Sequence, residues 1–482
     1  MKEWWKDGVP AFVVVGRVNS GKSSTLATLL EVDDDEILRI SATPGETTGV
    51  QALPVVYDDE EWMRFFDTPG FQQPVEAMRE IERMAGGRAP GLDDLRAFVA
   101  ECGDRFPDEV RLLAPVVEGA GVLYVVDPCK PLRDSFLAEI EILRWSGRPR
   151  LALLNPQSEP NENEEAWRER LGAAFNLVRT FDAHEARYDE RRKLLLSLLQ
   201  IEERHAERIE HVVAAMDTEW DERREDATEA LMDFLEQSLT LRTTDAIEER
   251  DESIPSRRER KEAALAEEYF GKLAKLEAKC VEKLLQTYRH HLIEVDVDVS
   301  RHRGLDLATD ETWRKWGLNR LQLTAAGALA GGAAGAVFDL GVGVHSLGAG
   351  TVIGALGGGT AAFFKGGQLP ELKVKLGGGL KLKGGDGKAI VIGPPASLNF
   401  PWVLLDSMLL RYRGILERAH GRRDDGELDP GEGESLVRQF PSDRRSLLQK
   451  WFNSCLKGSP DRSREAEVFS ALMESLEEVE GS

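Results

Sequence analysis

The stretch AFVVVGRVNSGKSSTLATLLEV, residues 11–32, decides how the N-terminal third of this 482-residue chain folds. The run AFVVV has no polar alternation, which predicts a central strand buried on both faces of a parallel sheet. GRVNSGKS, residues 16–23, satisfies the pattern G-x-x-x-x-G-K-[ST] directly after that strand, and STLATLLEV has the pattern of a helix. A glycine-rich turn between a strand and a helix gathers main-chain N–H groups that can hold the phosphates of a nucleotide.

The residues of this loop have distinct expected roles. Backbone N–H groups would converge on a β-phosphate, the Lys22 ammonium would reach the β- and γ-oxygens, and the Ser23 hydroxyl would ligate Mg²⁺. The residues that we expect to contact a nucleotide here are Gly16, Asn19, Ser20, Gly21, Lys22, Ser23 and Ser24.

Two further segments follow in the order that a nucleoside triphosphatase needs. SATPGETTGV supplies Thr48 as the predicted magnesium-binding hydroxyl, with Thr47 as the alternative. FFDTPG places Asp67 where it can hold a magnesium-bound water and Gly70 where its amide can bond the γ-phosphate. The predicted metal ligands are therefore Ser23, Thr48 and Asp67, and the predicted catalytic residues are Asn19, Lys22, Thr48 and Gly70. Thr47, Asp67, Gly70 and Asn155 complete the predicted nucleotide contacts.

Short apolar runs alternate with helical patterns as far as residue 185. This alternation predicts an α/β domain with a mostly parallel sheet flanked by helices. The other candidate strands are VQALPVVY and WMRFF, which would form an adjoining pair, and VLYVV, RLALL and LVRTF.

The order GxxNxGKS, TxGxTT and DTPG resembles the translation-factor-related GTPases of the Era and TrmE kind, over roughly residues 11–182. The resemblance implies GTP and GDP as ligands, Mg²⁺ as cofactor and hydrolysis of GTP. Asn19 matches an asparagine that coordinates K⁺ in several members. Phe71 stands where Ras-like proteins place a catalytic glutamine, so hydrolysis would depend on the ion, on a dimer partner, or on Gln72 or Gln73.

The base-reading motif departs from this family. The expected NKxD is replaced by Asn155-Pro156-Gln157-Ser158, which retains the asparagine but offers no carboxylate at its last position. FDAH, residues 181–184, falls where the family has SAK. Loss of a charge-assisted contact to the base costs about 1.5–3 kcal/mol, so strict guanine selectivity stays open.

Composition limits the possible partners and the compartment. The formal charge of −23 argues against a general nucleic-acid binder, because phosphate contacts need an excess of Lys and Arg. Four cysteines lie far apart without a CxxC pair, so neither a zinc site nor a disulfide framework is indicated. This cysteine pattern suits a reducing cytoplasm.

The remainder divides by composition into three parts. Residues 186–300 carry long charged segments with apolar helical stripes, which predict a helical hairpin or stalk. Residues 301–370 hold a nearly uncharged segment, 321–367, with glycines spaced four apart, which predicts a glycine-rich helical hairpin. Residues 371–482 begin with alternating Lys and apolar positions, which predict a small β element before the C-terminal helices.

The whole layout resembles a bacterial group of GTPases fused to a domain of unknown function. We expect a nucleotide-dependent switch that hydrolyses GTP with Mg²⁺ and is coupled to membrane association or self-assembly, with a homodimer formed through the GTPase domain or the stalk. The alternative is a soluble GTP-binding regulator with little turnover and relaxed base specificity. Whether the glycine-rich hairpin contacts the inner membrane from the cytoplasm, or packs within the protein or an oligomer, stays open.

Overall fold

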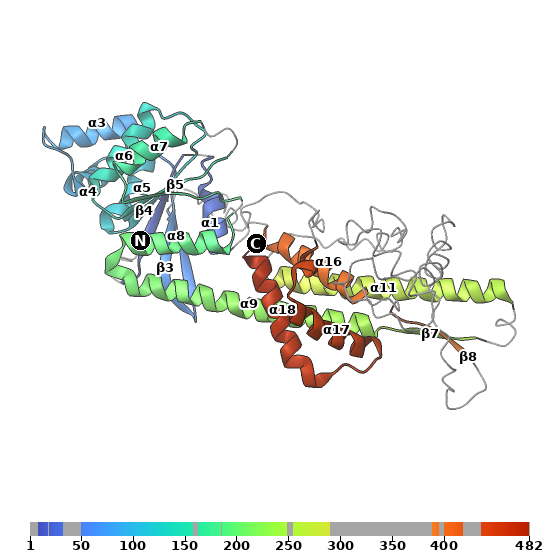
Figure 1. Ribbon diagram of the computed structural model, residues 1–482. Helices are drawn as coiled ribbons and strands as arrows, with labels where there is room; N and C mark the ends of the chain where they lie inside the picture. Colours follow the sequence, from blue (N-terminus) through green and yellow to red (C-terminus); the bar gives the residue numbers. More distant parts are fainter. Residues whose placement is uncertain are drawn as a thin grey trace. The chain divides into compact units, whose positions relative to one another are not determined.

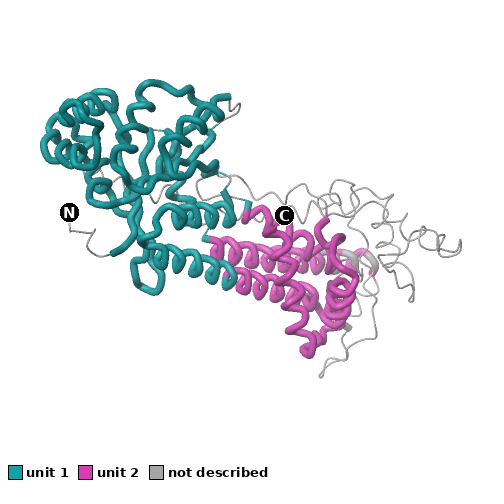
Figure 2. Tube along the Cα trace, turned by 60° about the vertical axis from the view of Figure 1, so that its left-hand side comes forward, with its two compact units in different colours: residues 1–222, 289–292, 417–425 teal, residues 223–288, 293–416, 426–482 magenta. Residues whose placement is uncertain are grey.

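The computed structural model describes residues 8–17, 19–31, 50–157, 162–184, 186–247, 254–289, 388–394, 400–417 and 435–481. The chain folds as two compact units, coloured separately in Figure 2. The first comprises Met1–Glu222 with two short later pieces, Arg289–Leu292 and Glu417–Asp425. The second comprises Arg223–Tyr288, Ile293–Leu416 and Gly426–Ser482.

The first unit is built on a six-stranded sheet with the strand order β2-β3-β1-β4-β5-β6. All neighbouring strands are parallel except β2, which pairs antiparallel with β3. The strands are β1 (Ala11–Val15), β2 (Gln51–Tyr57), β3 (Glu60–Asp67), β4 (Gly121–Val126), β5 (Arg150–Leu154) and β6 (Leu177–Thr180). The predicted α/β class with a mostly parallel sheet is therefore confirmed.

Helices cover both faces of this sheet (Figure 1). Because successive side chains of a strand point to opposite faces, Val13 and Val15 enter one core while Phe12 and Val14 enter the other. The first core is closed by α3 (Pro74–Met84), α4 (Leu92–Glu101), α5 (Pro107–Glu118), α6 (Asp134–Trp145) and α7 (Glu164–Gly172). The second is closed by α1 (Lys22–Leu30), α8 (Tyr188–Ile201) and the start of α9 (Ala206–Thr240).

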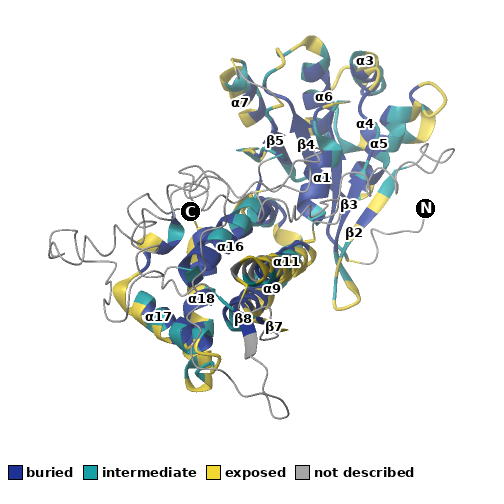
Figure 3. Cartoon of the chain, turned by 90° about the vertical axis from the view of Figure 1, so that its right-hand side faces the viewer, coloured by how far each residue is buried: buried dark blue, intermediate teal, exposed yellow. Residues whose placement is uncertain are grey.

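The burial of the central strands explains why their sequences are apolar without polar alternation. Every residue of β1 and β4 is buried, and Figure 3 shows the central strands in the colour of buried residues. The first unit extends beyond residue 185, the domain end expected from the sequence, because α8 and residues 206–222 of α9 are needed to cover the second face.

The second unit is largely helical. Besides residues 223–240 of α9, it contains α11 (Pro255–Thr287), α16 (Phe400–Leu416), α17 (Ser442–Leu456) and α18 (Glu465–Glu480). The Cys280 thiol of α11 donates to the Ala230 carbonyl of α9 at 3.5 Å, so these two helices pack together. Short 3-10 turns lie at Glu203–His205 in the first unit and at Leu436–Gln439 and Arg462–Arg464 in the second.

A two-stranded antiparallel ladder accompanies these helices. β8 (Lys388–Ile392) falls within the β element expected after residue 371, and it pairs with β7 (Thr243–Ile247), which the sequence did not indicate. The glycine-rich hairpin expected at 301–370 lies outside the described residues. Within the described helices, none combines the length and the apolar character needed to cross a membrane.

Candidate nucleotide-binding site

The loop between β1 and α1 has the backbone of a phosphate-binding turn. Gly21, immediately before α1, adopts a left-handed conformation with φ 85° and ψ 24°, and Asn19 is also left-handed with φ 62°. No side chain caps the start of α1. The N–H groups of the first helical turn therefore donate to no capping side chain. They also carry the partial positive charge of the helix dipole.

Close packing requires two of the loop glycines. A Cβ atom added at Gly16 would lie 2.3 Å from the Val125 carbonyl oxygen, and one at Gly21 would lie 2.0 Å from Nδ2 of Asn155. Both distances are far below van der Waals contact, so any other residue would force the loop away from β4 or from the end of β5.

The DTPG segment lies directly against this loop. β3 pairs with β1 so that Asp67 stands beside Val14, and the Thr68 hydroxyl donates to the Val14 carbonyl at 2.9 Å. A Cβ atom at Gly70 would lie only 2.5 Å from the Gly16 carbonyl oxygen. Gly70 is buried, and its N–H donates no hydrogen bond to any described residue. Backbone N–H groups of buried residues usually have an acceptor, and this one, without an acceptor among the described residues, lies at the edge of the phosphate loop.

Lys22 and Asp67 influence each other electrostatically. The Lys22 ammonium donates to the carbonyls of Gly16 at 2.8 Å and Arg17 at 3.0 Å. Burial lowers the pKa of Lys22, opposed by the charges of Asp67 and Glu139. Burial raises the pKa of Asp67, opposed by Lys22 and by a hydrogen bond from the Thr68 backbone. A cation beside Asp67 or an anion beside Lys22 would favour the ionised form of each group.

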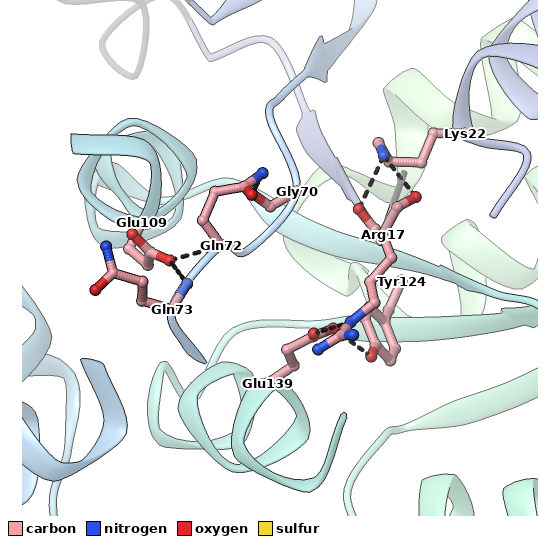
Figure 4. A network of polar contacts seen from close by, with 9 residues as sticks. Arg17, Lys22, Gly70, Gln72, Gln73, Glu109, Tyr124 and Glu139 are labelled. Atoms are coloured by element: carbon pink, nitrogen blue, oxygen red, sulfur yellow. Dashed lines mark hydrogen bonds and ion pairs between the residues drawn. The ribbon is translucent and has the colours of Figure 1, made fainter. Parts of the chain in front are cut away.

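A buried polar network fixes the start of the loop (Figure 4). Glu139, fully buried on α6, accepts hydrogen bonds from Nε of Arg17 at 2.8 Å and from the Tyr124 hydroxyl at 2.8 Å. The Arg17 guanidinium also lies 4.4 Å from the centroid of the Phe136 ring. Burial raises the pKa of Glu139, while Arg17 and Tyr124 lower it. Sequence analysis missed this network, because no local pattern marks a helical glutamate as the partner of a loop arginine.

Asn155 joins the phosphate loop to the loop at residues 181–184. Its Nδ2 donates to the Ser20 carbonyl at 3.1 Å, and its Oδ1 accepts from the Ala183 N–H at 3.1 Å. Both ends of the amide are therefore engaged with the main chain. Next to it on the 181–184 loop stands Asp182, whose Oδ1 accepts from the His184 N–H at 2.9 Å.

A second lysine reaches the apex of the phosphate loop. Lys130, in the turn after β4, donates to the Asn19 carbonyl at 3.3 Å and lies 3.2 Å from the Asp127 carboxylate. A cavity of about 340 Å³ opens beside it, lined among others by Arg17, Ser20 and Arg133. The Ser20 hydroxyl is buried and has no hydrogen-bond partner within the described part of the chain.

The structure thus brings most of the predicted site residues to one end of the sheet. The residues of this set that are described are Gly16, Asn19, Ser20, Gly21, Lys22, Ser23, Ser24, Asp67, Gly70 and Asn155. Thr47, Thr48 and Ser158 lie outside the described residues. Phe71 points into the first core with 5% of its surface exposed.

Two comparisons with family models divide the chain in the same order as the sequence analysis. Residues 11–155 match a family described as a 50S ribosome-binding GTPase, and the phosphate loop and DTPG segment described above lie within this match. The N-terminal domain has the P-loop GTPase fold. Residues 168–474, more than half of the chain, match the model described as a domain of unknown function, DUF3482. The chain belongs to the DUF3482 family. The DUF3482 match includes α8 and all of α9, and so begins within the first compact unit.

Solved structures add little to this assignment. A bacterial selenocysteine-specific elongation factor, EF-Sec, is 16% identical over 40% of this chain and 29% of its own, with a TM-score of 0.26. Roco2 RocCORdC of Methanosarcina barkeri bound to GDP is 16% identical over 40% of this chain and 50% of its own, with a TM-score of 0.23. The matches thus span half or less of these two proteins. No curated protein matches the sequence.

Proposed function

We propose that this protein is a nucleotide-dependent switch that binds GTP with Mg²⁺ and hydrolyses it slowly. The observation that carries the proposal is the position of Gly70, a buried residue that lies against Gly16 of the phosphate loop and whose N–H donates to no described residue. A donor at that point suits a γ-phosphate and would be left unsatisfied by a diphosphate, so the segment would respond to hydrolysis.

Different groups of the phosphate loop would contact different parts of the triphosphate. We assign the main-chain N–H groups between Asn19 and Ser24 to the phosphate oxygens, and Lys22 to the β- and γ-phosphates. Ser23 and Asp67 offer a hydroxyl and a carboxylate, the oxygen ligands that Mg²⁺ prefers, and the raised pKa of Asp67 is the shift that a divalent cation would offset. Thr48, or Thr47, would complete the set. When bound, Mg²⁺ would neutralise charge on the β- and γ-phosphates.

Turnover is expected to be slow because the position after Gly70 has no polar side chain. Phe71 is buried in the core and cannot orient water. We propose that K⁺ held by Asn19, as in the Era and TrmE GTPases that the sequence resembles, or a second copy of the chain, supplies the missing contribution. The same burial of Phe71 favours the alternative, a GTP-binding regulator with little turnover.

Recognition of guanine needs a carboxylate that Ser158 does not provide. Asn155 uses one donor and one acceptor of its amide on the main chain, and an amide is not the carboxylate that guanine needs. We propose Asp182 for this role, because it lies on the loop that Asn155 holds. Within the described residues its Oδ1 accepts a hydrogen bond from the His184 N–H, and its Oδ2 accepts none. A carboxylate can accept from both the N1–H and the 2-amino group of guanine.

A structural change caused by nucleotide hydrolysis would be transmitted from the sheet to α9 by the β2–β3 hairpin. In the chain this hairpin lies between residues 32–49 and the DTPG segment, and it packs on α9. The Trp62 ring stacks on His211 with 3.6 Å between centroids, and Arg208 donates to the Glu61 carbonyl at 3.2 Å. Since α9 continues as residues 223–240 of the second unit, a shift of the hairpin would act on the helix shared by both units.

The output of the switch is proposed to be self-assembly or a membrane contact through residues 321–367. Flotation with liposomes, using the intact chain and a chain lacking 321–367, would separate the two. Lipid binding that requires the segment and GTP would support the membrane contact. Absence from lipid in every nucleotide state, together with GTP-dependent dimerisation in light scattering, would support self-assembly.

The central experiment is calorimetric titration with GTP, GDP, ATP and ADP, combined with measurement of phosphate release. We expect Lys22→Ala to weaken binding about 10- to 100-fold, because a charge-assisted contact to phosphate is lost. Lys193→Ala, an exposed lysine on α8, is the matched control. Unchanged affinity and turnover in Lys22→Ala would refute the proposed site.

A further inference from the structure

Glu109 of α5 binds the main chain just beyond the DTPG segment. A single carboxylate oxygen, Oε1, accepts the N–H of Gln72 at 2.8 Å and the N–H of Gln73 at 2.6 Å (Figure 4). The two partners are separated from Glu109 by 37 and 36 positions in the sequence. Gln73 is the residue that precedes α3, and α3 has no other side-chain cap.

This carboxylate is deeply buried. Glu109 is 1% exposed, and its second oxygen, Oε2, has no hydrogen-bond partner within the described residues. It also forms no ion pair with any described cation. Burying a carboxylate that has only two neutral donors costs stability, and a helix start exposed to solvent could be capped by Ser, Thr or Asp at lower cost. A capping role alone therefore does not explain the choice of residue.

The position of Glu109 relative to the DTPG segment indicates a second role for this residue. Between Asp67 and Gln73 the backbone is fixed at three earlier points: Thr68 bonds Val14, Gly70 touches Gly16, and Phe71 enters the core. Glu109 adds the fixed point on the far side of Gly70. The unsatisfied N–H of Gly70 is thus held between an anchor on β1 and an anchor on α5.

We propose that Glu109 is a positioning residue that holds the Gly70 N–H in the orientation that receives a γ-phosphate. The inference rests on the proposed GTP-binding function and deepens it, because it makes Glu109 a determinant of the preference for a triphosphate over a diphosphate. Glu109 touches neither the nucleotide nor the reacting atoms, and acts through the main chain of Gln72 and Gln73.

The test compares affinities for GDP and for the non-hydrolysable analogue GMPPNP, both with Mg²⁺, in three variants. In Glu109→Ala both N–H groups lose their acceptor, and we expect GMPPNP affinity to fall about tenfold or more while GDP affinity changes less than about twofold. Glu109→Gln keeps one acceptor oxygen without its charge and should lie between the wild type and Glu109→Ala. Glu118→Gln, an exposed glutamate on the same helix, is the matched control and should bind both nucleotides as the wild type does.

The outcomes separate the inference from the function on which it rests. The positioning role is refuted if the ratio of the GMPPNP and GDP affinities in Glu109→Ala equals that of the wild type. If both affinities fall equally, the fold as a whole has loosened. Retained GDP affinity serves as the internal check that the variant is folded. If the unaltered protein binds neither nucleotide, the proposed function itself fails, and the inference with it.

Discussion

The side-chain amide of Asn155 donates to the Ser20 carbonyl at 3.1 Å and thereby fixes the phosphate loop to the end of β5, 135 positions away in the sequence. The same amide accepts from the Ala183 N–H, so one buried residue sets the distance between the phosphate loop and the loop at residues 181–184. Tight packing of Nδ2 against Gly21 leaves this contact little freedom.

Replacing Asn155 with alanine should therefore weaken binding of every nucleotide to a similar degree. Two buried main-chain groups lose their partner, which costs about 1–3 kcal/mol in the free energy of unfolding. Urea unfolding and titration with GDP and ADP measure the two effects. Asn176→Ala, at an exposed position, is the comparison variant. Loss of GDP affinity alone, with ADP affinity retained, would show instead that Asn155 reads the base.

Asp67→Asn should stabilise the nucleotide-free protein at neutral pH. Burial raises the pKa of Asp67 in the folded state, so the unfolded state releases this proton at a lower pH. The free energy of unfolding therefore falls as the pH rises from the ordinary pKa of aspartate through the raised pKa. The amide has no such penalty. We expect a higher Tm than the wild type at pH 7, a difference that shrinks toward pH 4, and loss of Mg²⁺-dependent nucleotide binding. Asp104→Asn, at an exposed loop position, should show neither change. An equal or lower Tm at pH 7 would contradict the prediction.

Asp182→Asn should exchange guanine preference for xanthine preference. The carboxylate accepts from the 2-amino group of guanine, whereas an asparagine amide can donate to the 2-oxo group of xanthine. Losing a charge-assisted pair should lower GDP affinity about tenfold or more, and affinity for xanthosine diphosphate should rise. Calorimetry with both diphosphates measures the exchange, with Asp189→Asn as control. Weaker binding of both bases would assign Asp182 a purely structural role.

Phosphate release should be faster in KCl than in NaCl at the same ionic strength. Asn19 adopts the left-handed backbone at the apex of the phosphate loop, and its side chain is the proposed K⁺ ligand. Asn19→Gly removes the side chain but tolerates the left-handed backbone, so it should abolish the difference between the two salts while leaving GDP affinity within about twofold. Equal rates in both salts for the wild type would remove K⁺ from the proposal.

Tyr412→Phe should destabilise the second unit without affecting the nucleotide site. The buried Tyr412 hydroxyl donates to Glu480 at 2.6 Å and lies 2.6 Å from the Tyr288 hydroxyl. Removing it leaves buried polar groups one partner short, at a cost of about 1–3 kcal/mol. Urea unfolding measures the loss, and calorimetry with GDP should be unchanged because the site is built from residues of the first unit. A stability equal to the wild type would mean that the hydroxyl contributes nothing net.

The second unit was only partly predictable. The apolar stripes of α9 and α11 have helical spacing, so both helices could be expected from the sequence. The strand β7 could not, because TTDAI between them becomes a strand only through pairing with β8, more than a hundred residues later. Pairing between distant strands leaves no mark in the local pattern.

The sequence by itself determined the parts of the site that depend on local backbone chemistry: an unbroken apolar run for β1, glycines for the left-handed turn at Gly21, and the DTPG that ends β3. These signals are local because a buried strand and a tight turn each restrict the residues that form them. Only the tertiary structure decided which side chains hold that backbone in place. Glu139 contacts Arg17, Asn155 contacts Ser20 and Glu109 contacts Gln72 across 122, 135 and 37 positions of the sequence. Such contacts arise from the order of the strands in the sheet and from how the helices pack on it.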